Sequence, residues 1–175
     1  MLVLTDIGSN IGPHSLTVAA MQREVVVVDA VFYNLALISL SHKITNKGKV
    51  KILYNSISDK QGEQLYPYLE AQHQHMAGAT YLVTKEDLDS GKYKWEEVIG
   101  PPAVSVTTKD IFDQIDSDVV IIKIDVEGHE CKVCSLGLFI TSRFLGHFHF
   151  SPIPCHLVSS LDHVLVMKKN LFIHL

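Results

Sequence analysis

The residues with the clearest chemical potential are an acid and three turn-forming residues near the amino terminus, in the order Asp6-x-Gly8-x-Asn10-x-Gly12. They follow a short apolar run and precede residues 15–21, which have apolar side chains at helical spacing. A glycine at position 8 lets the backbone turn tightly and approach a ligand that a Cβ atom would exclude. The helix that follows begins with free backbone amides. A strand, a glycine turn and a helix in this order indicate a ligand pocket at the turn.

A second acid, Asp29, lies 21 positions after Gly8 and directly follows four consecutive valines. Such β-branched runs are typical of strands buried on both faces of a parallel sheet. In a doubly wound sheet the carboxyl ends of neighbouring strands open onto one crevice. A carboxylate at that place can accept hydrogen bonds from both ribose hydroxyls. The two acidic strand ends therefore predict a nucleoside pocket.

The glycine spacing distinguishes between nucleoside ligands. The dinucleotide pattern G-x-G-x-x-G requires glycines where this chain has Asn10 and Pro13, so a nicotinamide oxidoreductase is the less favoured alternative. The pattern D/E-x-G-x-G-x-G, with Asn at its middle glycine, fits instead and is typical of S-adenosylmethionine pockets. Asp6 would then lie near the ammonium end of this cationic ligand.

A third acidic strand end supplies the candidate catalytic carboxylates, Asp125 and Glu127, after the apolar run at residues 119–124. Alternate residues of an extended chain point to opposite sides, so we expect only Asp125 to face the pocket. A carboxylate within hydrogen-bond reach of an acceptor hydroxyl can take its proton during methyl transfer. Glu127 could instead bind backbone amides at the next helix start.

The order of apolar patterns predicts the fold. Strands and helices alternate through the first 57 residues, which implies parallel strands joined by right-handed crossovers. We therefore predict an α/β fold with a doubly wound, mostly parallel sheet. The predicted strands are residues 2–6, 25–29, 50–57, 81–84, 104–106 and 119–125, and the predicted helices are residues 15–21, 31–42 and 109–115, the last capped by Thr108. Residues 87–95 are predicted to form a polar loop.

Four sequence blocks resemble the FkbM family of S-adenosylmethionine-dependent methyltransferases, over roughly residues 3–132. The blocks are Asp6-Ile-Gly-Ser-Asn-Ile-Gly12, the valine strand ending at Asp29, Ser56-Ile-Ser-Asp59 with Gly62, and Ile122-Lys-Ile-Asp-Val-Glu-Gly-His-Glu130. The resemblance implies a Rossmann-like class I methyltransferase sheet. It also implies O-methylation of a small-molecule or glycan hydroxyl. By this resemblance the cofactor site would be lined by Asp6, Gly8, Asn10, Gly12 and Asp29. Asp59 would lie near the adenine. The methyl group or acceptor would be faced by Asp125, Glu127 and Glu130.

Charge divides the chain into two expected parts. Residues 1–132, the methyltransferase-like domain, hold 30 of the 34 charged side chains, and residues 133–175 form a divergent hydrophobic tail. The tail does not resemble the closing strands of the family, and the chain lacks the sequence that usually precedes its first strand. We therefore expect a truncated or alternatively spliced product with an open sheet edge. A catalytically inactive binding or regulatory remnant is the alternative to an active enzyme.

Composition excludes several other classes. With 47% hydrophobic and 19% charged residues the chain is not intrinsically disordered, and a formal charge of -4 does not favour nucleic-acid binding. We find no signal peptide, and the best candidate span, residues 25–41, contains Asp29 and Asn34, so a cytoplasmic location is the default expectation. Three cysteines fit a reducing compartment.

Three clusters admit a metal or ligand role, but we expect each to be structural or solvated. They are Cys131 and Cys134 with Cys155, His156 and His129; His73 with His75; and the His147-Phe-His-Phe150 repeat. The cysteines lack the second C-x-x-C or H-x-x-x-H that a zinc site requires. No metal is therefore predicted.

Overall fold

The computed structural model describes residues 2–73, 80–117, 119–126 and 163–168. Its strands are β1 (Leu2–Ile7), β2 (Glu24–Asp29), β3 (Lys49–Ile57), β4 (Gln64–Tyr68), β5 (Tyr81–Thr84), β6 (Ala103–Val106), β7 (Val119–Ile124) and β8 (His163–Lys168). Its helices are α1 (Pro13–Ala20), α2 (Phe32–Thr45), α3 (Lys85–Asp89) and α4 (Thr108–Phe112), with 3-10 turns η1 (Ala71–His73) and η2 (Trp95–Glu97).

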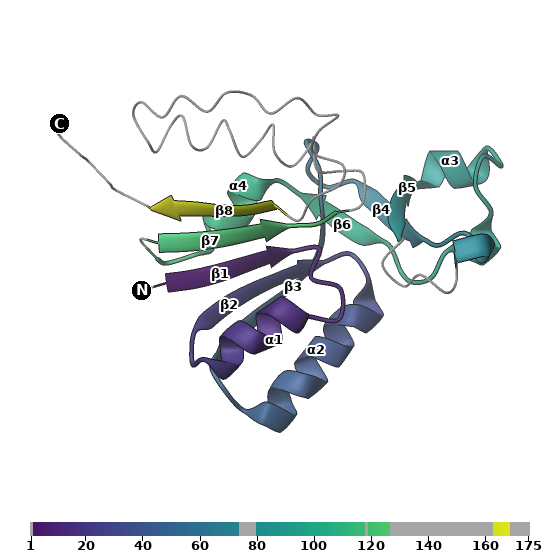
Figure 1. Cartoon of the computed structure of the whole chain (residues 1–175). Helices are drawn as coiled ribbons and strands as arrows, with labels where there is room; N and C mark the ends of the chain where they lie inside the picture. Colours follow the sequence, from purple (N-terminus) through teal and green to yellow (C-terminus); the bar gives the residue numbers. More distant parts are fainter. Residues whose placement is uncertain (1, 74–79, 118, 127–162, 169–175) are drawn as a thin grey trace.

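The strands form one mixed sheet in the order β5-β4-β6-β3-β2-β1-β7-β8. The five strands β6, β3, β2, β1 and β7 are parallel, whereas β4 is antiparallel to both its neighbours and β8 is antiparallel to β7 (Figure 1). The predicted α/β class and the mostly parallel sheet are thus confirmed. Because β1 lies between β2 and β7, the three predicted acidic strand ends are neighbours.

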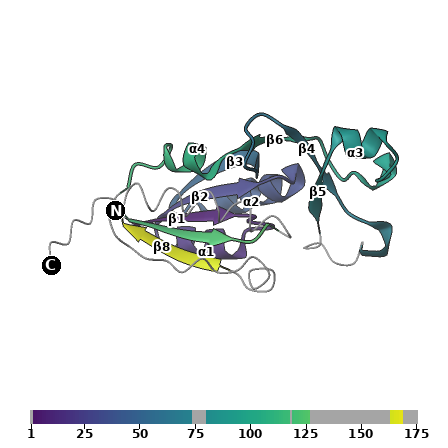
Figure 2. The same ribbon diagram turned by 90° about the horizontal axis from the view of Figure 1, so that it is seen from above.

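Helices cover both faces of the central strands. Side chains of α1 and α2, including Ala19, Leu35 and Ile38, pack on one face with Leu4 and Val25 of the strands. Residues Ile111 and Ile115, from α4 and the turn after it, pack on the opposite face with alternate strand residues. Figure 2 shows α4 and α1 on opposite sides of the sheet. The valine run of β2 divides between the two cores: Val25 and Val27 join one, and Val26 and Val28 join the other.

The edge of the sheet beside β7 differs from the prediction. We expected this edge to stay open, but β8 pairs with all six residues of β7, from Val119 to Ile124. Pairing supplies partners for the backbone groups that an edge strand otherwise leaves free. The strand lies in the segment 133–175, and its sequence, His-Val-Leu-Val-Met-Lys, has the β-branched content of a strand. The division of the chain at residue 132 stays a prediction.

The region between β3 and β6 forms a small lobe, in which the predicted strand at residues 81–84 is confirmed as β5 but β4 was not predicted. Here Tyr68 of β4 and Tyr81 of β5 form an aromatic cluster with Tyr93, which follows α3. The predicted polar loop at residues 87–95 is wrong at its start, because α3 covers Lys85–Asp89. The Thr84 side chain accepts a hydrogen bond from the Asp87 amide and so begins this helix.

The cap of α4 also differs from the prediction. Thr107, not Thr108, is the N-cap residue, and it forms a capping box with Asp110. Thr108 is the first residue of the helix and its side chain is buried. Within the described part of the chain, no helix has the length and apolar character that crossing a bilayer requires.

Candidate functional site

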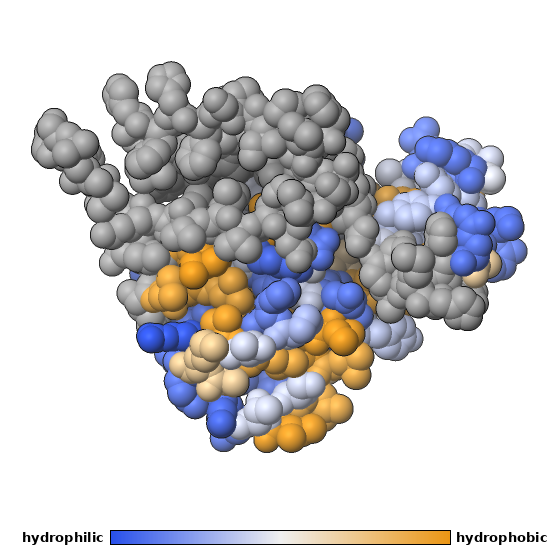
Figure 3. Space-filling model, viewed as in Figure 1, coloured by the Kyte–Doolittle hydropathy of each residue, from blue (hydrophilic) through white to orange (hydrophobic). Residues whose placement is uncertain are grey.

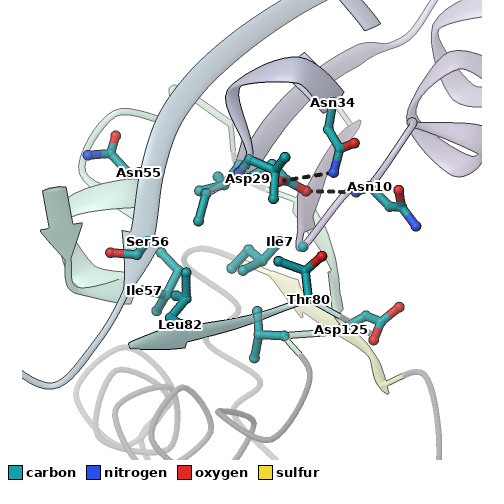
Figure 4. Close-up of a pocket in the computed structure, with 15 residues that line it drawn as sticks. Ile7, Asn10, Asp29, Asn34, Asn55, Ser56, Ile57, Thr80, Leu82 and Asp125 are labelled. Atoms are coloured by element: carbon teal, nitrogen blue, oxygen red, sulfur yellow. Dashed lines mark hydrogen bonds between the residues drawn. The ribbon is translucent and has the colours of Figure 1, made fainter. Parts of the chain in front are cut away.

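A hollow of about 160 Å³ opens at the carboxyl ends of the parallel strands. Its lining includes Gly8, Asn10, Asp29 and Asp125 from the ends of β1, β2 and β7 (Figure 4). The two carboxylates are the only charged groups among the fifteen described lining residues. The hollow therefore has an acidic lining at the place where the sequence predicts a nucleoside pocket.

Asp29 links the loop after β1 to the loop after β2, both of which border the hollow. Its Oδ2 accepts a hydrogen bond from the Asn10 amide at 2.8 Å, and its Oδ1 accepts one from the Val31 amide at 2.7 Å. Two longer contacts, at 3.5 Å from the Ser9 hydroxyl and 3.4 Å from the Asn34 amide nitrogen, complete its surroundings. Figure 4 shows the bonds of Asp29 with Asn10 and Asn34. The two short bonds fix the carboxylate plane, while the two long ones are weak.

Burial controls the ionisation of Asp29. The side chain is almost fully buried, and loss of hydration raises the pKa of its carboxyl group above the usual value. The hydrogen bonds from Val31, Asn10 and Asn34 act in the opposite direction and offset part of this rise. Asp29 is therefore easier to protonate than an exposed aspartate.

The glycine turn brings β1 against the end of β7. Gly8 has a φ of 71°, and a Cβ atom there would lie 1.6 Å from the carbonyl oxygen of Asp125. The Gly8 amide donates to the Val28 carbonyl at 2.9 Å, and the Asp125 amide donates to the Ile7 carbonyl at 3.0 Å. Only glycine allows this close approach, so residue 8 determines how near the strand ends lie.

A buried lysine holds the same strand ends together. Asp6 and Lys123 are register partners on β1 and β7, and Lys123 Nζ lies 3.4 Å from Asp6 Oδ1. The ammonium group also donates to the Gly8 carbonyl at 2.9 Å and to Asp125 Oδ2 at 3.3 Å. The Ser15 hydroxyl donates to the other Asp6 oxygen at 2.6 Å. Lys123 thus positions both the glycine turn and Asp125.

The domain that contains this hollow matches a known protein family. The family described as the methyltransferase FkbM domain matches residues 6–155, which is most of the chain. The chain belongs to the FkbM methyltransferase family. Neither the search of curated proteins nor the search of solved structures found a match.

In this FkbM domain, four of the predicted site residues line the hollow and three do not. Gly8, Asn10, Asp29 and Asp125 are brought together. Asp6 has no exposed surface, so in this arrangement its carboxylate contacts Ser15 and Lys123 and not a ligand. Gly12 lies against Ile38 of α2 and does not line the hollow. Asp59 is exposed, accepts a hydrogen bond from the Ser58 hydroxyl and is not among the residues that line the hollow. The predicted residues Glu127 and Glu130 lie outside the described residues.

The FkbM hollow has further lining residues that sequence reasoning missed. Asn55 and Ser56 come from β3, Leu82 comes from β5, and Thr80 directly precedes β5 (Figure 4). The block at Ser56 was part of the family resemblance, so its neighbours could have been proposed from it. No local pattern indicates Thr80 and Leu82, because β5 reaches the hollow through the antiparallel lobe.

The alternative sites of the sequence analysis stay untested in the FkbM domain. Where the structure describes the chain, no three histidine, cysteine or acidic side chains come close enough to hold a metal ion. The side chains of the cysteine cluster, of the two neighbouring histidines and of the His-Phe repeat lie outside the described part.

Proposed function

We propose that this domain is an S-adenosylmethionine-dependent methyltransferase that methylates a hydroxyl oxygen of a small molecule or glycan. The observation that carries this proposal is Asp29, a buried carboxylate at the end of β2 that lines the hollow beside the glycine turn. The order β3-β2-β1-β7 and the helices on both faces support the finer interpretation as a doubly wound, Rossmann-like class I sheet.

Asp29 has the bonding capacity that a ribose requires. An ionised carboxylate offers about four lone-pair sites, and two of them receive short bonds from backbone amides here. The contacts from Ser9 and Asn34 are long and therefore weak, so ligand donors at shorter distance can replace them. Two ribose hydroxyls would supply those donors, and the amide bonds would keep the carboxylate oriented toward them.

The charge of the hollow favours a cationic ligand. Its described lining contains two carboxylates and no lysine or arginine, so a pyrophosphate would meet like charge there. The sulfonium group of S-adenosylmethionine carries positive charge and supplies the methyl group when bound. The hollow is smaller than the roughly 300–1,000 Å³ of typical ligand pockets. We therefore assign it to the ribose portion, with the rest of the ligand extending beyond it.

Asp125 is the proposed base. Its side chain is 41% exposed and lines the hollow across from Asp29. Lys123 holds one of its oxygens, and the other, which bonds no described side chain, can accept the proton of an acceptor hydroxyl. Transfer to oxygen depends strongly on alignment of the acceptor with the methyl group and sulfur, so this positioning matters as much as basicity.

Calorimetric titration with S-adenosylmethionine and with S-adenosylhomocysteine tests the ligand. We expect both to bind, and NADH not to bind. Asp29→Ala should lower the affinity at least about tenfold, whereas Asp89→Ala on exposed α3 should not change it. Unchanged affinity in a folded Asp29→Ala protein would remove the ribose assignment.

Transfer of a labelled methyl group to a panel of hydroxylated small molecules and glycans tests the reaction. Asp125→Asn should reduce kcat much more than it weakens cofactor binding, by about 100-fold or more. Equal losses in both would make Asp125 a binding residue. Tight cofactor binding without transfer to any acceptor would favour the alternative, an inactive binding remnant.

A further inference from the structure

Helix α2 is apolar on two opposite sides. Leu35 and Ile38 face the core and are buried. At 100° per residue, a second apolar stripe runs along the other side of the helix, and its members are 51–76% exposed. We call this set the α2 stripe: Tyr33, Leu37, Leu40 and Ile44. Figure 3 shows hydrophobic residues gathered over the region where Figure 1 places α2.

The α2 stripe is unusual for a surface helix of a soluble domain. Surface helices normally turn charged or polar residues outward, and a helix that is hydrophobic all round is normally covered. The four side chains extend over twelve residues, and the eleven steps between the first and the last make a length of about 16 Å along the helix axis. Contiguous exposed apolar surface of this kind marks an interaction site.

Positive charge gathers at the carboxyl end of the same helix. Three exposed cations lie on the end of α2, on the turn into β3 and on the turn before β2; we call them the basic end: Lys43, Lys47 and Arg23. The exposed lysines of β3, Lys49 and Lys51, alternate with Val50 and Ile52, which pack toward α1 and α2, so they point to the other face of the sheet and are not part of the basic end. The Lys49 amide donates to the Arg23 carbonyl at 3.3 Å, which ties the two turns together. Exposed Met21 adds apolar surface beside them.

This part of the chain contains almost no acid to neutralise those cations. Between residues 21 and 58 the acids are Asp29, which is buried at the hollow, and Glu24, which is half-buried opposite Lys49 in the sheet register. The chain as a whole carries a formal charge of -4. The basic end is therefore a local reversal of the overall charge, next to an exposed apolar stripe.

From this juxtaposition we propose that the α2 stripe and the basic end form a docking surface for an anionic lipid bilayer. An interfacial helix places its apolar side chains among the acyl chains and its lysines among the headgroups. Anionic headgroups supply the counter-charge that the basic end lacks. A second copy of the chain would present an equally acid-free surface, so the charge pattern favours the bilayer over a dimer.

Docking in this way would also orient the candidate site. Val31 and Asn34, at the beginning of α2, line the hollow. A bilayer along the α2 stripe would therefore hold the hollow close to the headgroups. Only this consequence rests on the proposed function, because the docking surface is independent of Asp29 and Asp125.

Vesicle co-sedimentation of the full chain tests the proposal. We expect sedimentation with vesicles of equal parts phosphatidylcholine and phosphatidylserine, little with phosphatidylcholine alone, and a decrease as salt is raised. Lys43→Glu with Lys47→Glu should weaken the binding at least about twentyfold. The matched control is Lys85→Glu with Lys92→Glu, an equal charge change on the β4-β5 lobe, which should leave binding nearly unchanged.

A fluorescence measurement locates the contact without removing apolar surface. The single native tryptophan, Trp95, lies on η2, away from α2. Leu40→Trp should show emission that brominated lipids quench, whereas the unmodified chain should not. Absence of sedimentation, equal sedimentation with both vesicle types, or quenching of Trp95 alone would each overturn the proposal. So would a stable dimer without vesicle binding, dissociated by Leu40→Ser with Ile44→Ser, since the α2 stripe would then belong to a second copy.

Discussion

At the residue scale, Asp29 combines a structural and a binding task in one carboxylate. Its short bonds from Asn10 and Val31 hold the turns after β1 and β2 in place. Burial makes its ionised form costly, and the proposed ribose hydroxyls would be donors to that form. Binding and ionisation of Asp29 are therefore coupled.

The raised pKa of Asp29 gives a prediction with a definite sign. Ribose hydroxyls favour the ionised carboxylate, so affinity falls as the pH drops through the pKa of the free protein. Because that pKa is raised, the loss should begin at a higher pH than for an ordinary aspartate, whose pKa is about 3.9. Calorimetry with S-adenosylhomocysteine at a series of pH values, with Asp89→Asn as the control, measures this dependence. Asp29→Asn should bind more weakly and with a flatter profile; an unchanged profile would contradict the assignment.

Lys123 gives a second prediction at this scale. Replacing it by Met leaves the fully buried Asp6 without its counter-charge, which should lower the free energy of unfolding by about 3–5 kcal/mol. Adding Asp6→Asn to Lys123→Met should restore most of that loss, because no uncompensated charge then remains. Urea unfolding of the two single variants and the double variant forms the cycle. Strictly additive losses would show that the two groups do not interact.

At the element scale, the site depends on the close approach of two strand ends. The turn after β1 passes over the end of β7, and residue 8 lies where a side chain would collide with the Asp125 carbonyl. The parallel register of β1 with β7, and of β1 with β2, places the acidic ends side by side. The turn is thus a part of the site and also a packing contact.

Gly8→Ala tests this contact against a matched substitution. Gly91 also has a left-handed φ, 76°, but a Cβ atom there would meet no atom within 4 Å. Gly91→Ala should cost only the left-handed conformation, about 1–2 kcal/mol. Gly8→Ala should cost clearly more and should also weaken cofactor binding, because the end of β7 must move. Urea unfolding of the two variants measures both losses of stability. Equal losses in Gly8→Ala and Gly91→Ala would exclude a steric role for residue 8.

At the scale of the whole molecule, both faces of the sheet are packed and the proposed ligand lies at its rim. A ligand that binds only the folded chain stabilises it, by about 2.7 kcal/mol at a hundredfold excess over Kd. For a chain of this size, S-adenosylhomocysteine should therefore raise Tm by about 5–10 °C. Thermal unfolding of the unmodified chain and of Asp29→Ala measures this shift. A shift of the same size in both would place the ligand elsewhere.

The amino-acid sequence by itself determined the alternation of strands and helices and the positions of the acidic strand ends. These features are local: the valine run of β2, the Gly8 turn and the apolar run of β7 each occupy a few consecutive residues. Local periodicity and the conformational freedom of glycine are sufficient to predict them.

The tertiary structure alone decided which of those residues share the hollow and what holds them there. Strand β4 contains Pro67, which argues against a strand in sequence, yet it pairs with β5 and β6. The pairing of β8 with β7 and the contact of Lys123 with Asp6 join residues that are far apart in the chain. Strand order, register and burial are long-range properties, and no local pattern specifies them. For that reason Asp6 and Asp29 look alike in sequence, although one contacts a buried lysine and the other lines the hollow.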